Sequence, residues 1–238
     1  MSMSAEFTTR INWLLENVLP LPLRDVLVKA MIKLFFKEDA EAYLTLKEKA
    51  YKMTPEDFQA LYANLSKDVL QRETDLNQAS IDLILQSIVG ETVLDVGCGR
   101  KFLANKIVET FHAKKRVTGI DFNIEESHDK QADPYFVAGD IYQLPFEDQS
   151  FDTVICTHTL EHVLDIQKAI GELRRICRKK LIVVVPCQRE CRYTFNLHIH
   201  FFPYPYSLLQ TMGNPNGICK KAGLDLFYEE NLLSFPQQ

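Results

Sequence analysis

Hydrophobic residues in the first 75 positions recur at the three- and four-residue spacing of amphipathic helices. The pattern predicts one helix that is interrupted at Pro20, and a second helix over residues 24–36. Thr54 and Pro55, followed by two acidic residues, predict the start of a third helix, because these residue types favour a helix N-terminus. We therefore expect residues 1–75 to form a helical extension that caps, or lies beside, a core domain.

The pattern changes near Ile81 to short apolar runs that alternate with amphipathic segments. The apolar runs predict strands at 92–96, 116–120, 134–137, 151–157, 181–185 and 224–228. The segments between them predict helices at 79–89, 102–111, 160–177 and 207–212. This alternation indicates an α/β fold: a doubly wound, mostly parallel, Rossmann-like sheet with helices on both faces. We expect residues 76–238 to form this domain.

The C-terminal part of the pattern is less regular. Asn214 and Pro215 predict the cap and the first turn of a short helix. After the strand at 224–228, residues 231–235 either add a short seventh strand or leave the edge of the sheet open.

Composition and charge narrow the class of protein. The chain has 238 residues, of which 46% are hydrophobic, enough to bury one large core and a smaller helical element. Its net charge of −5 argues against a nucleic-acid partner held through phosphate contacts. We expect no transmembrane segment and no signal peptide, because no apolar run has the required length or flanks.

The cysteines and the N-terminal lysines bear on location. Cys187 and Cys191 are the one close pair, and they lack the second pair that a metal site would need. We therefore expect free thiols and a cytoplasmic protein. Lys29 and Lys33 are offset by nearby acids, which favours packing of the helices on the core, although peripheral membrane contact stays open.

Two glycines follow the first predicted strand, in the sequence VLDVGCGR at 93–100. Gly97 and Gly99 allow the backbone to turn sharply and to approach a ligand closely. The helix N-terminus that follows favours an anionic group. A dinucleotide site would need a third glycine where Phe102 stands, so the phosphate fingerprint fails.

Polar and aromatic residues follow the next two predicted strands. Asp121 is placed to accept hydrogen bonds from both hydroxyls of a ribose, and Phe122 can lie against an adenine ring. Asp140 can accept from an exocyclic amine, and Ile141 can cover the other face of the ring. Because the carboxyl ends of parallel strands meet at one edge of a sheet, these residues predict a site for a nucleoside linked to an amino acid.

The chain resembles the class I S-adenosylmethionine-dependent methyltransferases over about residues 76–230. Four segments carry the resemblance in order and spacing: VLDVGCGR, TGIDFN, VAGDIYQLPFEDQSFDTVICTHTLEHV and LIVVVP. It is strongest to the group that includes ubiquinone-type, glycan and natural-product methyltransferases, and it implies S-adenosylmethionine as cofactor. The implied cofactor-binding residues are Asp95, Gly97, Cys98, Gly99, Asp121, Phe122, Asn123, Asp140, Ile141 and Thr157. The first four form the loop on the methionine side, and Thr157 lies near the sulfonium.

Two features depart from the family pattern. Lys101 stands where the family often has a third small residue, so its side chain must point outward. The family's last two strands form a hairpin, whereas few residues follow the strand predicted here at 224–228, so the second strand of a hairpin at 231–235 stays open.

Histidines follow the fourth and fifth predicted strands and leave three hypotheses open. His158, His162 or His200 can act as a general base. Alternatively, Glu161 and His162, with His198 or His200, can bind a divalent metal, as the similar small-RNA 2′-O-methyltransferases do. Thirdly, Glu161 and His162 can simply hold a loop by hydrogen bonds.

The segment 190–206 is strongly aromatic, and its side chains either line an acceptor pocket or form core. The stretch at 198–202 is similar to one in glycan methyltransferases. We therefore expect a small organic acceptor, methylated on oxygen: a sugar, a lipid-linked molecule or a natural product. Two alternatives remain, a metal-assisted 2′-O-type enzyme and a catalytically silent protein that binds the cofactor or a partner.

Overall fold

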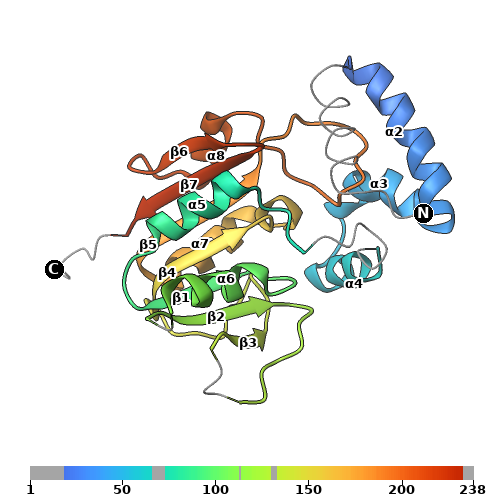
Figure 1. Cartoon of the computed structure of the whole chain (residues 1–238). Helices are drawn as coiled ribbons and strands as arrows, with labels where there is room; N and C mark the ends of the chain where they lie inside the picture. The colour runs from blue at the N-terminus through green and yellow to red at the C-terminus, as the bar shows by residue number, and fades with distance from the viewer. Residues whose placement is uncertain (1–18, 66–72, 113, 130–132, 233–238) are drawn as a thin grey trace. The chain divides into compact units, whose positions relative to one another are not determined.

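The computed structural model describes residues 19–65, 73–112, 114–129 and 133–232 of the chain (Figure 1). They group into two compact units. The first unit combines the N-terminal helices with residues 188–201, and the second comprises the rest. The hydrophobic pattern placed a boundary at 75/76 and gave no sign that residues 188–201 belong with the helices. The helix predicted before Pro20 lies outside the described residues.

The first unit contains helices α2 (Leu21–Phe36), α3 (Ala40–Ala50) and α4 (Pro55–Leu65), with a 3₁₀ turn η1 (Lys37–Asp39) between the first two. The predicted cap of α4 is confirmed, because the hydroxyl of Thr54 accepts a hydrogen bond from the backbone N–H of Asp57 at 3.2 Å. The buried guanidinium of Arg24 donates to the carbonyl of Tyr193 at 2.9 Å. This bond fastens segment 188–201 to α2.

The second unit is built on a sheet that has seven strands within the described residues. The strands are β1 (Thr92–Val96), β2 (Arg116–Asp121), β3 (Tyr135–Ala138), β4 (Phe151–Thr157), β5 (Cys177–Pro186), β6 (Ile218–Ala222) and β7 (Asp225–Asn231). Their order across the sheet is β3-β2-β1-β4-β5-β7-β6. The first five run parallel, and β7 is antiparallel to both of its neighbours.

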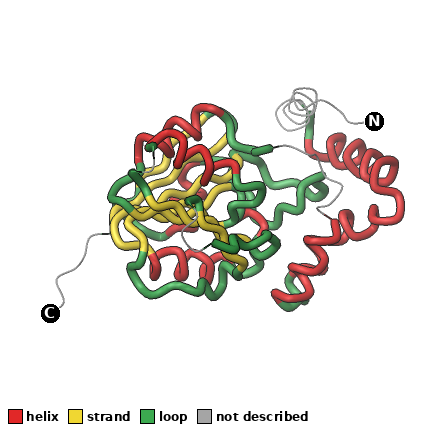
Figure 2. Tube along the Cα trace, turned by 60° about the horizontal axis from the view of Figure 1, so that its bottom comes forward, coloured by secondary structure: helices red, strands yellow, loops and turns green. Residues whose placement is uncertain are grey.

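Helices cover both faces of this sheet, as the sequence predicted (Figure 2). Helices α5 (Gln78–Ser87) and α6 (Phe102–Phe111) pack on one face, and α7 (Ile166–Ile176) and α8 (Pro205–Met212) pack on the other. Alternate residues of β5 enter the two cores: Ile182 lies beneath α5 and α6, and Val183 lies beneath α7 and α8. Burial on both faces explains the unbroken apolar run of this strand.

The single helix predicted at 160–177 was wrong. Leu160–His162 form a 3₁₀ turn, η3, the next three residues are not helical, and α7 begins at Ile166. Asp165 caps α7, because its carboxylate accepts from the N–H of Lys168 at 3.0 Å. The helical spacing of apolar residues continued across this break because Leu160 and Val163 are buried in the same core as α7.

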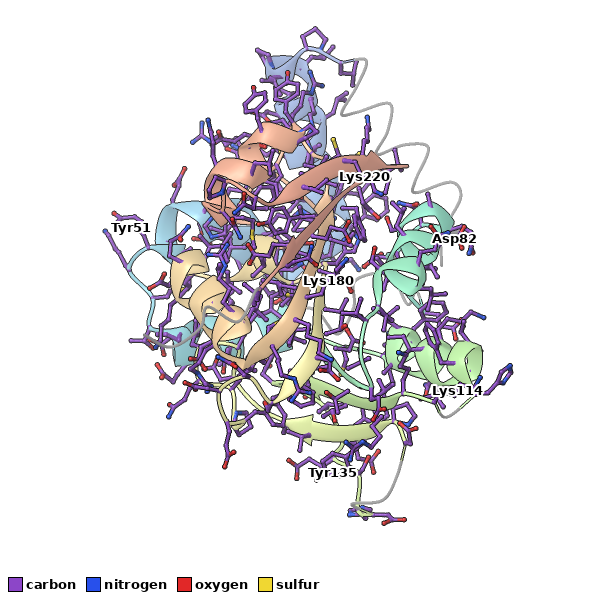
Figure 3. The ribbon with its side chains drawn as sticks, turned by 90° about the vertical axis from the view of Figure 1, so that its left-hand side faces the viewer. Tyr51, Asp82, Lys114, Tyr135, Lys180 and Lys220 are labelled. Carbon is purple, nitrogen blue, oxygen red and sulfur yellow. The ribbon has the colours of Figure 1, made fainter. Side chains whose placement is uncertain are left out.

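The C-terminal predictions also need correction. Asn214 does not cap a helix, because its side chain accepts from the N–H of Asn216 in a turn that leads into β6. The strand predicted at 224–228 is β7, which pairs with β6 in the hairpin typical of the family. Residues 231–235 do not form the seventh strand as far as they are described. The pattern missed β6 because it carries exposed Lys220 (Figure 3) and Lys221, charges that suit an edge strand.

Glu230 of β7 joins this strand to the helices on one face of the sheet. Its fully buried carboxylate pairs with Arg174 of α7 at 2.7 and 3.0 Å and accepts from the hydroxyl of Tyr228 at 2.8 Å. Arg174 also donates to the carbonyl of Met212, at the end of α8. Burial would by itself raise the pKa of Glu230. The hydrogen bonds from Arg174 and Tyr228 outweigh burial and hold that pKa below its ordinary value.

Replacement of Glu230 tests this anchor. We expect Glu230→Ala to lower the free energy of unfolding by about 3–5 kcal/mol, because Arg174 would stay partly buried without its partner. Glu109→Ala removes an exposed partner of Lys106 on α6 and should change that free energy by less than about 0.5 kcal/mol. Urea unfolding followed by circular dichroism measures both. Equal effects of the two substitutions would contradict the role of Glu230.

Candidate active site

The residues assigned to the cofactor from the sequence lie at or next to strand ends at one edge of the sheet. The register pairs Val96 of β1 with Ile120 of β2, and Asp121 of β2 with Ala138 of β3, so the three strands end together. Thr157 ends the neighbouring β4. The parallel register therefore brings the glycine loop and the two acidic turns to the same side of the second unit.

The two glycines of the loop after β1 have different roles. Both have positive φ, 73° at Gly97 and 44° at Gly99. A Cβ on Gly97 would lie 2.1 Å from Oγ1 of Thr159, so this glycine is required for packing. A Cβ on Gly99 would meet nothing within 4 Å. The backbone at Gly99 therefore faces open space in which a ligand can approach it.

The side chains of Cys98 and Lys101 turn away from that open space. Cys98 is buried in the core beneath α5 and α6, so only its backbone faces the loop. Lys101 has a left-handed backbone, with φ 69°, and its ammonium donates to the carbonyl of Glu125 at 3.1 Å. The same ammonium lies 4.5 Å from the ring centroid of Phe136. The outward orientation expected for Lys101 is thus what the structure has.

Asp121 fixes the loop that precedes it as well as the turn that follows it. One carboxylate oxygen accepts from the backbone N–H of Gly99 at 3.0 Å, and the other accepts from the N–H of Asn123 at 3.0 Å. Each oxygen can accept a second hydrogen bond, which leaves capacity for two ribose hydroxyls. The sequence suggested only the ribose contact and gave no signal for the bond to Gly99.

The other residues assigned to the cofactor differ in their exposure and in their hydrogen bonds. The ring of Phe122 is 38% exposed, and Ile141 is half-buried against the core beneath α7 and α8. One carboxylate oxygen of Asp140 accepts from the N–H of Tyr142 at 2.9 Å, which shapes the turn after β3. The backbone carbonyl of Thr157 accepts from the hydroxyl of Thr159 at 2.9 Å. This bond does not involve the side-chain hydroxyl of Thr157.

Asp95, next to the glycine loop, is a buried carboxylate. It is fully buried, and the one backbone group that lowers its pKa, the N–H of Ala104, is too distant or too poorly aligned for an ordinary hydrogen bond. Burial, and then the negative charge of Asp121, raise the pKa of Asp95 to about 7. A cation beside this group would favour its charged form, and the ammonium of a bound amino acid is such a cation.

His158 lies between two carboxylates at the end of β4. Its Nδ1 is 3.4 Å from Oε1 of Glu161, and its Nε2 is 3.5 Å from Oδ1 of Asp225. Burial lowers the pKa of His158, but the two carboxylates outweigh burial and raise it to about 10. The imidazole is therefore charged at neutral pH. Because a general base needs an unprotonated nitrogen that faces the acceptor, this geometry favours a structural role over the one expected from the sequence.

Asp225 extends this charged cluster to α5. Its other oxygen accepts from the side chains of Asn77 and Ser80, both at 2.7 Å. Asn77 also caps α5, because its side-chain oxygen Oδ1 accepts from the backbone N–H of Ser80 at 3.1 Å. An asparagine just before the predicted helix at 79–89 is a sequence signal for this cap that we overlooked. Asp225 had no such signal, because its partners come from distant parts of the chain.

Comparison with known proteins agrees with this geometry. Residues 94–185 match the family model for a methyltransferase domain. A 2-phytyl-1,4-naphtoquinone methyltransferase of Nostoc punctiforme is 31% identical over 130 residues, which are 49% of this chain and 56% of that protein. A demethylmenaquinone methyltransferase of Staphylococcus epidermidis is 33% identical over 125 residues, 50% of this chain and 49% of the relative. The chain thus spans about half the length of these curated relatives.

The structure of a SAM-dependent methyltransferase from Aquifex aeolicus matches with a TM-score of 0.52. It is 14% identical and covers 76% of this chain and 100% of its own, which shows a shared fold. The second unit therefore contains the matched methyltransferase domain, and its fold is that of the class I S-adenosylmethionine-dependent methyltransferases. Its glycine loop and terminal hairpin are those that the resemblance implied.

The other histidines are divided between the units. His162, in the methyltransferase domain, has its Nε2 4.0 Å from Oε1 of Glu161. His198 and His200 belong to the first unit. There His198 is buried, and its Nδ1 lies 2.7 Å from Oε1 of Gln188. A general base at His162 or His200, and a metal held by Glu161, His162, His198 and His200, therefore stay predictions.

The aromatic segment at 190–206 does not form one group. It crosses from the first unit into the methyltransferase domain after Phe201. Tyr193 and Phe202 are buried, whereas Tyr204 and Tyr206 are exposed and stack on each other with centroids 5.2 Å apart. The alternative that the segment is core holds for the buried members only, and the acceptor pocket stays a prediction.

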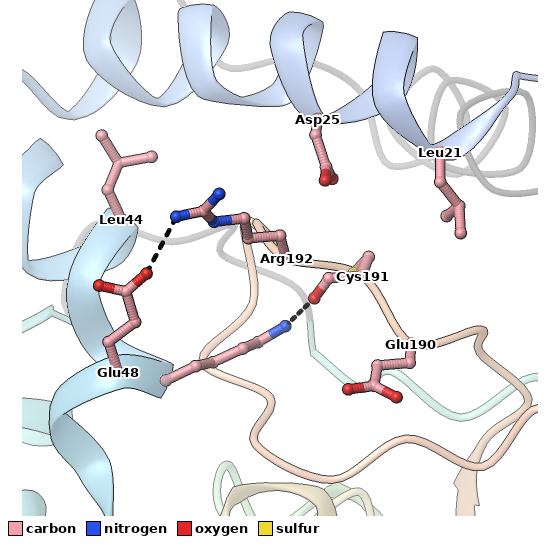
Figure 4. A pocket seen from close by; sticks show the side chains of 8 residues that line it. Leu21, Asp25, Leu44, Glu48, Glu190, Cys191 and Arg192 are labelled. Carbon is pink, nitrogen blue, oxygen red and sulfur yellow. Dashed lines mark hydrogen bonds and ion pairs between the residues drawn. The ribbon is translucent and has the colours of Figure 1, made fainter.

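The first unit has a pocket of its own, between α2, α3 and residues 190–192 (Figure 4). Its volume is about 440 Å³, and most of its lining residues are charged. Arg192 pairs with Glu48 at 3.1 Å, and the ammonium of Lys47 donates to the carbonyl of Cys191. Because Glu48 and Lys47 of α3 bond to Arg192 and Cys191, these charged groups serve to hold segment 188–201 against the helices. This role explains the pocket better than a role as an acceptor site.

The charge on His158 makes a pH-dependent prediction. Its pKa is raised in the folded state, so its pairing with Glu161 and Asp225 stabilises the fold fully below about pH 6.5 and is lost as the pH approaches 10. We expect His158→Gln to cost about 2–4 kcal/mol at pH 6 and clearly less at pH 10. Urea unfolding at both pH values measures this cost, with exposed His128→Gln as the control. A cost that is the same at both pH values would mean that His158 is not charged in the fold.

Proposed function

We propose that this protein transfers a methyl group from S-adenosylmethionine to a small, lipid-soluble organic acceptor at the carboxyl edge of the sheet. The observation that carries the proposal is the bare backbone at Gly99, which faces open space and is held by Asp121. The methyltransferase domain provides the family context, and the geometry of these two residues fits the adenosyl amino acid.

The chain's own residues supply binding and orientation. In this proposal the buried carboxylate of Asp95 favours the amino-acid end of the cofactor, and Asp121 accepts from the ribose hydroxyls. Phe122, Asp140 and Ile141 surround the adenine ring, and Thr157 lies nearest the reacting centre. The cofactor supplies a methyl group activated on a positively charged sulfur. The protein must therefore mainly align the acceptor, and such positioning can lower the barrier by several kcal/mol.

The class of acceptor is proposed from the relatives. The Nostoc and Staphylococcus proteins are named for a phytyl naphthoquinone and for demethylmenaquinone. We extend that class, a quinone-type ring with a lipid tail, to this chain. Transfer to oxygen was expected from the sequence and requires loss of the hydroxyl proton, for which charged His158 is unsuited. Transfer to oxygen or to a ring carbon is decided by analysis of the product.

The role of Gly99 can be separated from folding. We expect Gly99→Ala to fold at a cost of about 1–2 kcal/mol, because Cβ meets no protein atom but φ stays positive. The Kd for S-adenosylmethionine, measured by titration calorimetry, should rise at least tenfold, because Cβ enters the ligand's space. Gly171→Ala on α7, which also meets no atom, should leave the Kd unchanged. Unchanged affinity in Gly99→Ala would place the cofactor elsewhere.

Turnover tests the acceptor. Purified full-length protein is mixed with S-adenosylmethionine and, in separate reactions, a reduced prenyl naphthoquinone or a soluble sugar. We expect S-adenosylhomocysteine to accumulate with the naphthoquinone, and this accumulation should fall at least tenfold in Gly99→Ala. Turnover of the sugar alone would support a glycan acceptor, and turnover abolished by a chelator would support the metal-assisted alternative. Cofactor binding without turnover of any acceptor would support a catalytically silent protein.

A further inference from the structure

Helix α2 exposes an unusual amount of apolar surface. Of the twelve large hydrophobic side chains that are exposed in the described part of the chain, six belong to this helix. They are Leu21, Leu23, Val26, Leu27, Leu34 and Phe35, and they are between 41% and 70% exposed. Exposed apolar side chains gathered in this way mark an interaction surface rather than an ordinary solvated helix.

The spacing of these residues places most of them on one face. Leu23, Leu27 and Leu34 are four and seven residues apart, and Val26 lies beside them on the helix. The opposite face of α2 is already used, because Arg24, Val28 and Ile32 are buried in the first unit. Apolar residues thus occupy two faces of α2, and one of these faces is buried within the first unit.

Positive charge accompanies the exposed face. Lys29 and Lys33 lie on α2, Lys37 directly follows it, and all three are exposed. The single acid on the helix, Asp25, lies 3.6 Å from Arg24 and is drawn toward that buried cation. The chain as a whole has a net charge of −5, so the basic character of α2 is local. Leucines on one face with lysines beside them are typical of helices that lie in a membrane interface.

We propose that α2 lies on an anionic lipid surface. The face with Leu23, Leu27 and Leu34 enters the boundary between headgroups and acyl chains, and Lys29 and Lys33 reach back to the phosphates along their flexible stems. None of the described helices has both the length and the apolar character needed to cross a bilayer, so contact is at the surface. The purpose of this contact, access to a lipid-soluble acceptor, rests on the proposed function.

Vesicle flotation of the full chain tests the proposal without cofactor or acceptor. We expect the protein to float with vesicles of phosphatidylcholine and phosphatidylglycerol, and at least tenfold less with phosphatidylcholine alone. The double variant Leu27→Gln, Leu34→Gln should lose binding at least tenfold, and Lys29→Gln, Lys33→Gln should lose the preference for phosphatidylglycerol. Tyr51→Gln, which replaces a 75% exposed residue outside α2, should bind like the unchanged protein.

Four outcomes would overturn the proposal. The first is that the protein does not float, and the second is that it floats equally well after Leu27→Gln, Leu34→Gln. The third is a dimer, detected by light scattering, that this double variant dissociates, because a second copy would then cover the face. The fourth is a shift of the fluorescence of Trp13, the only tryptophan of the chain, to longer wavelength in the variant without vesicles, because residues 1–18 would then cover the face. Calorimetry with S-adenosylmethionine measures cofactor binding without vesicles, so it tests the proposed function separately from membrane binding.

Discussion

The hydrogen bond from the N–H of Gly99 to the carboxylate of Asp121, at 3.0 Å, is the interaction on which the candidate site depends. It joins the loop after β1 to the end of β2, and it is possible only because the parallel register brings the two strand ends together. A single carboxylate thus shapes the loop and keeps capacity for further hydrogen bonds. If Asp121 binds the ribose as proposed, a change at this residue affects both the form of the site and the affinity for the ligand.

Buried charge fixes the register of the terminal hairpin. Strand β7 carries a buried carboxylate near each end, Asp225 and Glu230. Asp225 meets His158 and the start of α5, and Glu230 meets Arg174 of α7 on the other face. A slip of one residue would turn both carboxylates to the wrong faces and leave their partners unpaired. These contacts therefore hold the terminal hairpin in the register that completes the sheet.

The parts that the sequence predicted well are those that depend on local pattern. Strands at 92–96 and 151–157 were placed within their observed bounds, because each is an apolar run buried on both faces. The start of α4 was predicted from the capping residue Thr54 together with Pro55 and the two acids that follow. The residues assigned to the cofactor could be placed at one edge because strand ends in a parallel sheet share that edge, so their order along the chain carries spatial information.

The parts that the sequence missed depend on distant contacts. Segment 188–201 joins the N-terminal helices through bonds such as that of Arg24, for which no spacing rule exists. The ion pair of His158 with Asp225 could not be predicted, because Asp225 lies 67 positions further along the chain. The prediction of one helix at 160–177 failed because the spacing of apolar residues indicates which side chains are buried. It does not indicate whether the helix continues without interruption between them.

The most direct test of the central claim is a crystal structure of the full chain with S-adenosylhomocysteine bound. We expect both ribose hydroxyls to lie within hydrogen-bond distance of Asp121 and the amino-acid end of the ligand to lie against the backbone at Gly99. A ligand bound away from the carboxyl ends of β1 and β2, or one whose ribose makes no contact with Asp121, would contradict it.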